Sequence, residues 1–91
     1  MQIVFSSRFK RDAKRYRHEE HVLAELGDAI ARLKVGAPFD ARLRDHALRG
    51  EWTDYRECHL LPDVLLVYKS NPKMGIVTLA RIGSHAELFG G

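Results

Sequence analysis

The fold of this chain is decided by residues 55–82, which read YRECHLLPDVLLVYKSNPKMGIVTLARI. Apolar and polar side chains follow a period of two in this stretch, which predicts three strands at 53–61, 64–69 and 75–82. Turn-forming residues at 61–63 and 70–73 separate the strands. Because both connections are short, we expect the three strands to form an antiparallel meander.

The residues before the meander predict one more strand and two helices. Residues 1–5 favour a strand, and Ser6 or Ser7 can cap the helix that follows. Helical spacing marks the two apolar stripes, which consist of Phe9, Ala13 and Tyr16, and of Val22, Leu23, Leu26, Ile30 and Leu33. Gly36 and Pro38 end the second helix, and Gly27 inside it indicates close packing.

The predicted fold class is therefore α+β, with the order β-α-α-β-β-β and two N-terminal helices on one face of a small antiparallel sheet. Residues 38–51 are expected to form a loop or a short irregular helix, and residues 83–91 a tail that folds back over the sheet. A chain of 91 residues buries enough surface for a single core, so we expect one domain over 1–91. The sheet face away from the helices stays partly open, and polar residues there are candidates for a site.

Composition excludes several classes of protein. No apolar run approaches the roughly 18 residues that span a bilayer, and residues 1–5 lack the features of a signal peptide. Cys58 is the one cysteine, which excludes an internal disulfide and a multi-cysteine zinc site and favours a reduced, cytoplasmic location. We expect this thiol to point toward the helices and to be inert.

The net charge of +3 is unevenly distributed. Between residues 8 and 17 the only acid is Asp12, and the bases are Arg8, Lys10, Arg11, Lys14, Arg15 and Arg17. A stripe of this density is typical of a surface that binds a polyanion or an acidic protein. A solvated helix face is the alternative interpretation.

Four residues that are far apart in sequence can meet at one end of the meander. The second strand ends where the third begins, and the fourth returns to the same end. This topology brings together His59, Asp63, Arg81 and His85. Cleavage of RNA without a metal needs a base for the 2′-OH, an acid for the 5′-oxygen and a cation for the phosphate charge. Histidine and arginine suit these roles, and the 2′-OH requirement excludes DNA as a substrate.

Other interpretations of the same residues stay open. Each histidine can be structural, and Asp63 follows a proline in a turn, where aspartate is favoured anyway. Arg81 is more informative, because an arginine in an apolar strand needs a partner. A metal site is a further alternative, with His46, His59, Asp63 and His85 as ligands.

The second half of the chain carries four motifs: DHALRGEW at 45–52, RECH at 56–59, PDVLLVY at 62–68 and RIGSHAELF at 81–89. In order and spacing they resemble the YafQ family of bacterial toxins within the RelE/ParE superfamily. That family's pattern is D-H-x-L-x-G-x-W, R-E-x-H, P-D-x-L-L-x-Y and R-x-G-S-H-x-x-L-F. The order of the predicted elements resembles the family over the whole chain.

The resemblance implies a RelE-like fold and a ribosome-dependent mRNA endonuclease, the toxin of a type II toxin–antitoxin pair. Such toxins cut mRNA in the ribosomal A site without a metal or cofactor, so the implied partners are the ribosome, mRNA and an antitoxin. Four residues match the family's acid–base set: His46, His59, Asp63 and His85. Arg81 matches its phosphate-binding arginine, and Phe89 and Arg56 are assigned to substrate binding. Val64 replaces a tryptophan that is frequent in the family, which puts substrate contact and codon choice in question.

Within this resemblance we expect Asp63 or His59 to be the base and His85 the acid, while His46 and Arg81 stabilise the phosphorane. The basic segment at 8–17 would bind ribosomal RNA or the antitoxin. Three rival interpretations remain: a ParE-like toxin that inhibits DNA gyrase without nuclease chemistry, a basic RNA-binding module, and an assembly component with a degenerate site. The histidines argue against the first of these, because ParE-like toxins lack them.

Overall fold

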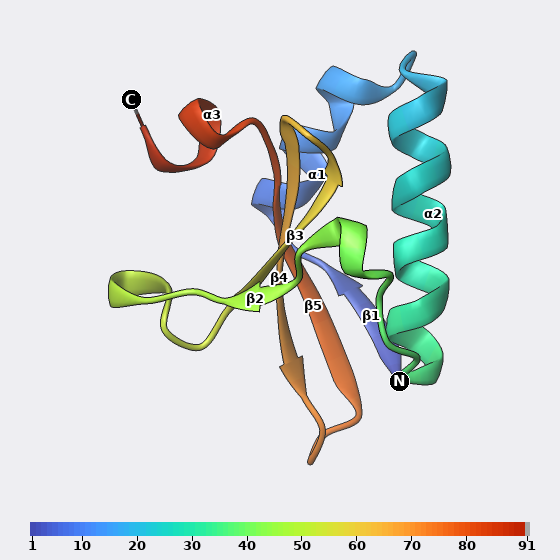
Figure 1. The fold of residues 1–91 in the computed structure, drawn as a ribbon. Helices are drawn as coiled ribbons and strands as arrows, with labels where there is room; N and C mark the ends of the chain where they lie inside the picture. Colours follow the sequence, from blue (N-terminus) through green and yellow to red (C-terminus); the bar gives the residue numbers. More distant parts are fainter. Residues whose placement is uncertain (91) are drawn as a thin grey trace.

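The computed structural model describes residues 1–90, which form a five-stranded sheet with helices on both of its faces. The predicted meander lies at the centre of this sheet and consists of β3 (Arg56–Leu61), β4 (Val64–Asn71) and β5 (Ile76–Gly83). β4 pairs with both neighbours antiparallel, as the short turns require. Figure 1 shows these strands running through the middle of the molecule. The α+β class and the meander are thus confirmed.

The sheet is mixed rather than wholly antiparallel, because its first strand pairs parallel to its last. β1 (Gln2–Phe5) lies beside β5, with Gln2 opposite Ile76 and Phe5 opposite Leu79. The opposite edge is β2 (His46–Ala47), a two-residue strand inside the segment expected to be a loop or a short irregular helix. The resulting strand order is β1-β5-β4-β3-β2. The expectation of a purely antiparallel sheet was wrong because period-two alternation does not determine which strands become neighbours.

The N-terminal helices form where the apolar spacing predicts them. α1 (Ser7–Ala13) is capped by the Ser6 side chain, and a 3₁₀ turn, η1 (Lys14–Tyr16), follows it. α2 (Glu20–Val35) ends at Gly36, which adopts the left-handed conformation with φ 69°. The interpretation of Gly27 was wrong, because a Cβ built there would meet no atom within 4 Å.

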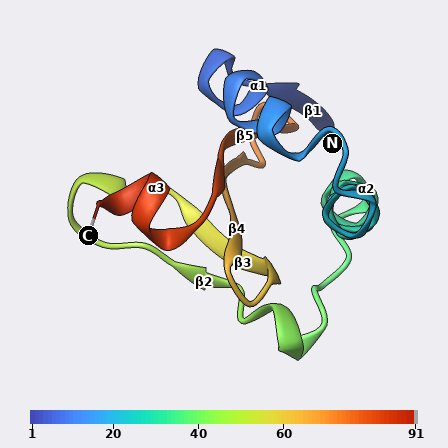
Figure 2. The ribbon, with the colours of Figure 1, turned by 90° about the horizontal axis from the view of Figure 1, so that it is seen from above.

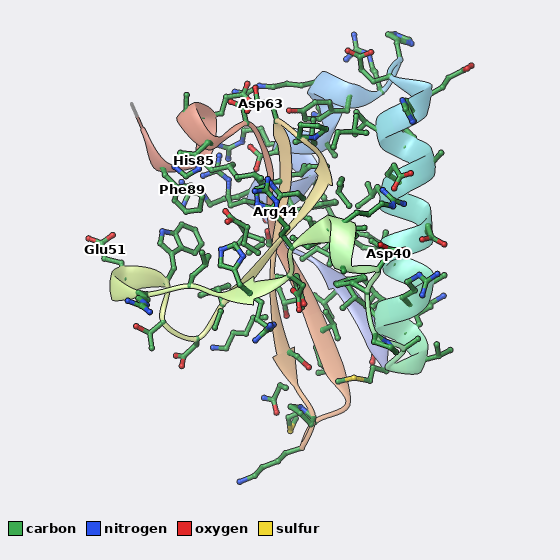
Figure 3. The ribbon with its side chains drawn as sticks, in the orientation of Figure 1. Asp40, Arg44, Glu51, Asp63, His85 and Phe89 are labelled. Carbon is green, nitrogen blue, oxygen red and sulfur yellow. The ribbon has the colours of Figure 1, made fainter. Side chains whose placement is uncertain are left out.

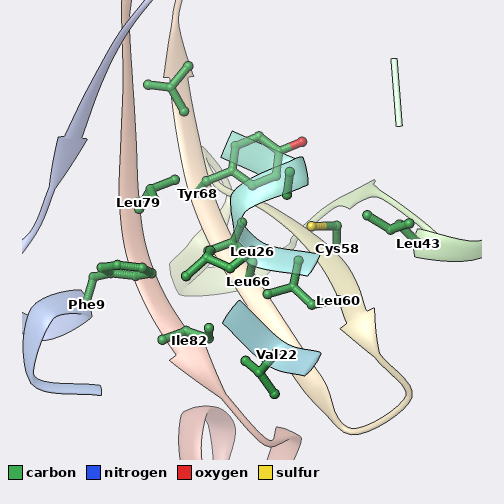
Figure 4. Packing of buried hydrophobic residues seen from close by; sticks show 12 residues of the cluster. Phe9, Val22, Leu26, Leu43, Cys58, Leu60, Leu66, Tyr68, Leu79 and Ile82 are labelled. Atoms are coloured by element: carbon green, nitrogen blue, oxygen red, sulfur yellow. The ribbon is translucent and has the colours of Figure 1, made fainter. Parts of the chain in front are cut away.

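The main core lies between α2 and the sheet, and Figure 4 shows its side chains between the two layers. β3 contributes Cys58 and Leu60, both about fully buried. Burial raises the pKa of the Cys58 thiol to about 12, so it stays protonated and inert, as predicted. Burying a leucine of this kind contributes about 1.5 to 3 kcal/mol.

A second, smaller core lies on the other sheet face, beneath the C-terminal residues. The tail forms a short helix, α3 (His85–Phe89), whose Leu88 packs on Leu65 and Val67 of β4. Ser84 and Glu87 form a capping box that starts this helix. In Figure 2 α3 and α2 lie on opposite sides of the strands. The tail does fold back over the sheet, and it leaves the part of this face near β2 and β3 open.

The rest of the segment at 38–51 contains two 3₁₀ turns, η2 (Ala41–Leu43) before β2 and η3 (Gly50–Trp52) after it. Among residues 1–90 no helix is long and apolar enough to cross a membrane.

Candidate active site

Two histidines and one glutamate gather on the open face at the β2–β3 edge. His46 of β2 lies opposite Glu57 of β3, and His59 follows two residues later on the same face of that strand. The His46 and His59 ring centroids are 6.2 Å apart. Glu57 Oε2 lies 3.0 Å from His46 Nε2 and 4.0 Å from His59 Nε2. A single carboxylate oxygen thus faces both rings.

Glu57 is the residue of this cluster that the sequence reasoning missed. Its side chain is 6% exposed, and its Oε1 atom finds no hydrogen-bond partner within the described chain. An unpartnered buried polar atom costs about 1 to 3 kcal/mol and is a feature of functional sites. The sequence did carry a signal, because side chains alternate between faces along the strand predicted at 53–61, which puts Glu57 on the face of His59.

Arg44 contacts both histidines from the side opposite Glu57. Its carbonyl oxygen lies 2.7 Å from His46 Nδ1, and its guanidinium Nη2 lies 3.1 Å from His59 Nδ1. Among residues 1–90 it is the one non-glycine residue with a positive φ, at 48°. A conformation of this kind costs about 1 to 3 kcal/mol and clusters at functional sites. No sequence pattern marked this residue.

Burial and the charge of Arg44 lower the pKa of His59 below its ordinary value of 6.5. The imidazole is therefore neutral near pH 7, the form that can accept a proton. Beside it lies a pocket of about 240 Å³, lined by Arg42 and Arg44 and by the apolar residues Leu60, Leu61 and Pro62. Arg44 is the arginine whose guanidinium contacts the proton acceptor.

The other predicted residues of this face come from α3 and from the β3–β4 turn. The register aligns His59, Leu65 and Gly83 across three strands, which confirms that the predicted strand ends meet. Figure 3 shows His85 and Phe89 on α3 and Asp63 at the tip of the turn above them. His85 is exposed, and its ring centroid is 5.2 Å from that of Phe89.

Side chains of η3 and η1 fix the position of α3 in this part of the site. Phe89 is half-buried and packs edge-on against Trp52, with 5.8 Å between the ring centroids. Burial, and then the carboxylates of Glu87 and Asp63, raise the pKa of Tyr16 above 10.0. The charge of Asp63 therefore acts on Tyr16 at the end of η1. Glu87 of α3 accepts hydrogen bonds from Arg15 and Tyr16 of the same turn.

Arg81 has the partner that its position in a strand requires. Its Nε and Nη2 atoms donate to the carboxylate of Asp12 on α1 at 2.6 and 3.0 Å, and the backbone N–H of Ile82 donates to the same carboxylate. A bulge between β4 and β5 places Arg81 opposite Val67, on the face that carries the histidines. The pair holds α1 against the end of β5 and fixes the direction of the guanidinium.

Arg56 does not join the other predicted residues. Its Nε and Nη2 donate to Asp45 Oδ2 at 3.1 and 2.9 Å, and Tyr68 donates to the other oxygen of the same carboxylate. Tyr68 belongs to the core beneath α2, so Arg56 lies on the opposite sheet face from His59. The three side chains fix the backbone next to His46.

Comparison with known proteins decides the family. Residues 1–90 match the family model described as "Bacterial toxin of type II toxin-antitoxin system, YafQ". The chain belongs to the YafQ family. The mRNA interferase toxin YafQ of Escherichia coli K12 is 33% identical over 89 residues, which cover 97% of this chain and 95% of that relative. The predictions of the family and of the enzyme class, an endoribonuclease, are thereby confirmed.

Solved structures agree with this assignment over nearly the whole length. A metal-bound toxin from Helicobacter pylori superposes with a TM-score of 0.89 at 37% identity, covering 98% of this chain and 99% of that one. YafQ in the E. coli DinJ–YafQ complex superposes with a TM-score of 0.85 at 32% identity, covering 98% of both chains. The α+β architecture is thus the YafQ architecture.

One group of residues in this YafQ-family chain could hold a metal ion, although not the set considered from sequence. His46, Glu57 and His59 each offer a ligand atom, and these atoms lie within 4.8 Å of one another. Two imidazoles and a carboxylate suit zinc or copper. His46 Nε2 lies only 3.0 Å from Glu57 Oε2, so an ion bound by all three residues would have to come between these two atoms.

The basic segment of this chain presents a cationic outer surface. Asp12, the only acid between residues 8 and 17, is 5% exposed and turned toward Arg81. Solvent exposes all six bases, Arg8, Lys10, Arg11, Lys14, Arg15 and Arg17, which we call the basic face. Arg15 alone has a carboxylate partner within the described residues, Glu87 of α3 at 2.8 Å.

Proposed function

We propose that this chain is a ribosome-dependent mRNA endonuclease, the toxin of a type II toxin–antitoxin pair. The observation that carries the proposal is the pairing of His46 and His59 around Glu57 on an open sheet face, in a member of the YafQ family. The E. coli relative is named as an mRNA interferase toxin, which supports mRNA as the substrate here. The reaction would take place on mRNA in the ribosomal A site, in the bacterial cytoplasm.

In the proposed reaction the ribose 2′-OH attacks the adjacent phosphorus, and the bond to the 5′-oxygen breaks. His59 is favoured over Asp63 as the base, because its lowered pKa leaves it neutral at physiological pH. His85 would give its proton to the departing oxygen. His46 and Arg81 would stabilise the charge on the phosphorane.

Substrate seating is proposed for Phe89, whose half-buried ring lies beside His85 and is held by Trp52. A base can stack on an aromatic ring fixed in this way. Arg56 is left out of the proposed substrate site, because Asp45 holds it on the other sheet face. Val64 begins β4 directly after Asp63, and its smaller side chain would leave room where relatives carry a ring.

Cleavage itself is tested by adding the purified protein to a translating extract and mapping the mRNA by primer extension. We expect cuts inside the reading frame that need ribosomes, with 2′,3′-cyclic phosphate or 3′-phosphate ends. Independence of a metal is tested separately with EDTA on ribosome-free RNA, if the protein cuts such RNA, because EDTA also removes the Mg²⁺ that ribosomes need. A supercoiling assay with DNA gyrase runs alongside. Intact mRNA together with inhibited gyrase would replace the proposal with the ParE-like alternative, and loss of ribosome-free cutting in EDTA would contradict metal-independent chemistry.

The basic face is proposed to bind ribosomal RNA, or the acidic part of an antitoxin when the toxin is held inactive. The complex of E. coli YafQ with DinJ supports an antitoxin partner. Because all six bases face solvent and the only acid among them is turned inward, their charges act together on a polyanion.

Changing Lys10, Lys14 and Arg17 to Glu should weaken ribosome binding and reduce its dependence on salt. Each lost phosphate contact lowers the slope of log K against log salt by about 0.7 to 0.9, so a reduction of about 2 to 3 is expected. Sedimentation with ribosomes at several salt concentrations measures it. A control variant, Lys34→Glu with Lys73→Glu, changes charge outside the basic face. An unchanged slope in the triple variant would leave the basic face as a solvated surface.

A further inference from the structure

Arg44 occupies a place that no family motif assigns. It follows η2, where the backbone turns into the left-handed region at φ 48° and ψ 45°. Two residues later the chain enters β2 with His46. Arg44 is exposed, and Figure 3 shows it near the centre of the view, between α3 and the η2 turn. One residue thus stands where the loop meets the histidine face.

The backbone carbonyl and the guanidinium of Arg44 each contact the Nδ1 atom of a histidine. The carbonyl oxygen of Arg44 reaches Nδ1 of His46 at 2.7 Å, and its guanidinium reaches Nδ1 of His59 at 3.1 Å. On the far side of both rings stands Glu57 Oε2, 3.0 Å from one Nε2 and 4.0 Å from the other. Arg44 thus contacts Nδ1 of each imidazole, while Glu57 Oε2 lies near Nε2 of each without a hydrogen bond to either.

These contacts give the two rings different hydrogen-bonding roles. A guanidinium can only donate, so His59 Nδ1 must accept, and the ring proton of His59 belongs on Nε2. Nδ1 then carries the one lone pair that can take the proton of the 2′-OH, so Arg44 aims this nitrogen and must give it up to the substrate in the reaction. A carbonyl oxygen can only accept, so His46 Nδ1 must donate. Arg44 thus donates to one ring through its side chain and accepts from the other through its backbone carbonyl oxygen.

The neighbouring arginines are engaged elsewhere. The Arg42 guanidinium borders the same pocket but pairs with Glu25 of α2 at 3.1 Å, and Arg81 is held by Asp12. Among the described side chains no carboxylate within 4.0 Å pairs with Arg44, so its remaining donors are free of an anion. The position of the Arg44 guanidinium beside His59 is therefore not set by an ion pair with a neighbouring carboxylate.

We propose that Arg44 is a positioning residue of the endonuclease site, which orients His46 through its left-handed backbone and His59 through its guanidinium. The proposal rests on the proposed function for its catalytic meaning. Holding two reactive rings within a fraction of an ångström matters because a displacement of about 1 Å can cost about 10²-fold in rate.

Two substitutions separate the backbone from the side chain. Arg44→Gly places at this position a residue that adopts positive φ at no cost, and it removes the side chain with its guanidinium, so His59 should lose its orientation while His46 keeps it. Arg44→Val introduces a β-branched residue that avoids this region, so both rings should be disturbed. Arg42→Gln is the matched control, because it removes an arginine from the same pocket without touching either ring.

The first measurement is single-turnover cleavage on programmed ribosomes, with the rate constant and the half-saturating concentration determined separately. Arg44→Gly should lower the rate constant about 10- to 100-fold with little change in half-saturation, and Arg44→Lys should recover part of the loss. Arg42→Gln should stay within about threefold. Raised half-saturation at an unchanged rate would make Arg44 a substrate contact and overturn the positioning role, as would an equal loss in Arg42→Gln.

The second measurement follows the ring resonances of His46 and His59 by NMR and needs no activity. Arg44→Gly should move the His59 resonances and leave those of His46 in place, Arg44→Val should move both, and Arg42→Gln neither. Unmoved His59 resonances in Arg44→Gly would overturn the proposal even in an active enzyme. If the wild type fails to cleave mRNA, the proposed function falls, and these resonances still decide whether Arg44 orients the rings. Arg44→Lys serves the same measurement if the glycine variant does not fold.

Discussion

Replacing His85 with alanine should lower mRNA cleavage about 10²- to 10⁴-fold, which is the usual worth of a positioned acid or base. Without the imidazole no group at the start of α3 can give a proton to the departing 5′-oxygen. The ring is exposed, and the capping box of Ser84 and Glu87 holds α3 without it. The free energy of unfolding should therefore change by no more than about 0.5 kcal/mol.

The measurement is single-turnover cleavage on programmed ribosomes, accompanied by a thermal melt and by ribosome sedimentation. His21→Ala is a matched control, because His21 is also an exposed histidine at the start of a helix, α2, but lies outside the candidate site. Cells that the wild type arrests should tolerate the His85 variant, while its binding to ribosomes persists. A folded variant that cleaves within about threefold of wild type would exclude His85 from the chemistry.

The sequence was informative wherever local pattern determines structure. Alternation and turn residues predicted the meander, and the meander in turn predicted that the ends of β3 and β5 meet, which the alignment of His59 with Gly83 confirms. The sequence also indicated the ion pair between Asp12 and Arg81, because Asp12 is the only acid of the basic segment and Arg81 needed a partner. Joining those two observations would have found the ion pair.

Other features depend on distant parts of the chain, and local pattern could not predict them. The parallel pairing of β1 with β5 joins residues more than 70 positions apart, and nothing in residues 1–5 specifies that neighbour. The left-handed backbone of Arg44 results from the turn between η2 and β2, and arginine gives no signal for it. The capping box at Ser84 and Glu87, by contrast, was a readable sign of α3.

Removing the Asp12 carboxylate should destabilise the fold strongly. Its partner Arg81 is 12% exposed, so Asp12→Ala leaves a nearly buried guanidinium and the Ile82 N–H without an acceptor. Breaking a buried pair from one side costs about 3 to 5 kcal/mol, out of a total of about 5 to 15 for a typical domain. Urea unfolding of the wild type and of Asp12→Ala measures the loss in the free energy of unfolding. Asp28→Ala is the control, because its exposed pair with Arg32 on α2 should contribute about 0.5 kcal/mol.

The acid dependence of stability gives an independent check on the same pair. Burial alone would raise the pKa of Asp12, but the hydrogen bonds from Arg81 and Ile82 N–H and the charge of Arg81 outweigh it and lower the pKa below 3.8. A carboxyl with a lowered pKa stabilises the folded state above its unfolded pKa and loses that effect as the pH falls through its folded value. The difference in the free energy of unfolding between wild type and Asp12→Asn should therefore be full at pH 5 and shrink on acidification below about pH 4.

Removing both partners, as in Asp12→Ala with Arg81→Met, should cost less than the two single changes added together, because no unpaired charge is left buried. Additive losses, or a gap that does not change with pH, would mean that the ion pair does not hold α1 to β5.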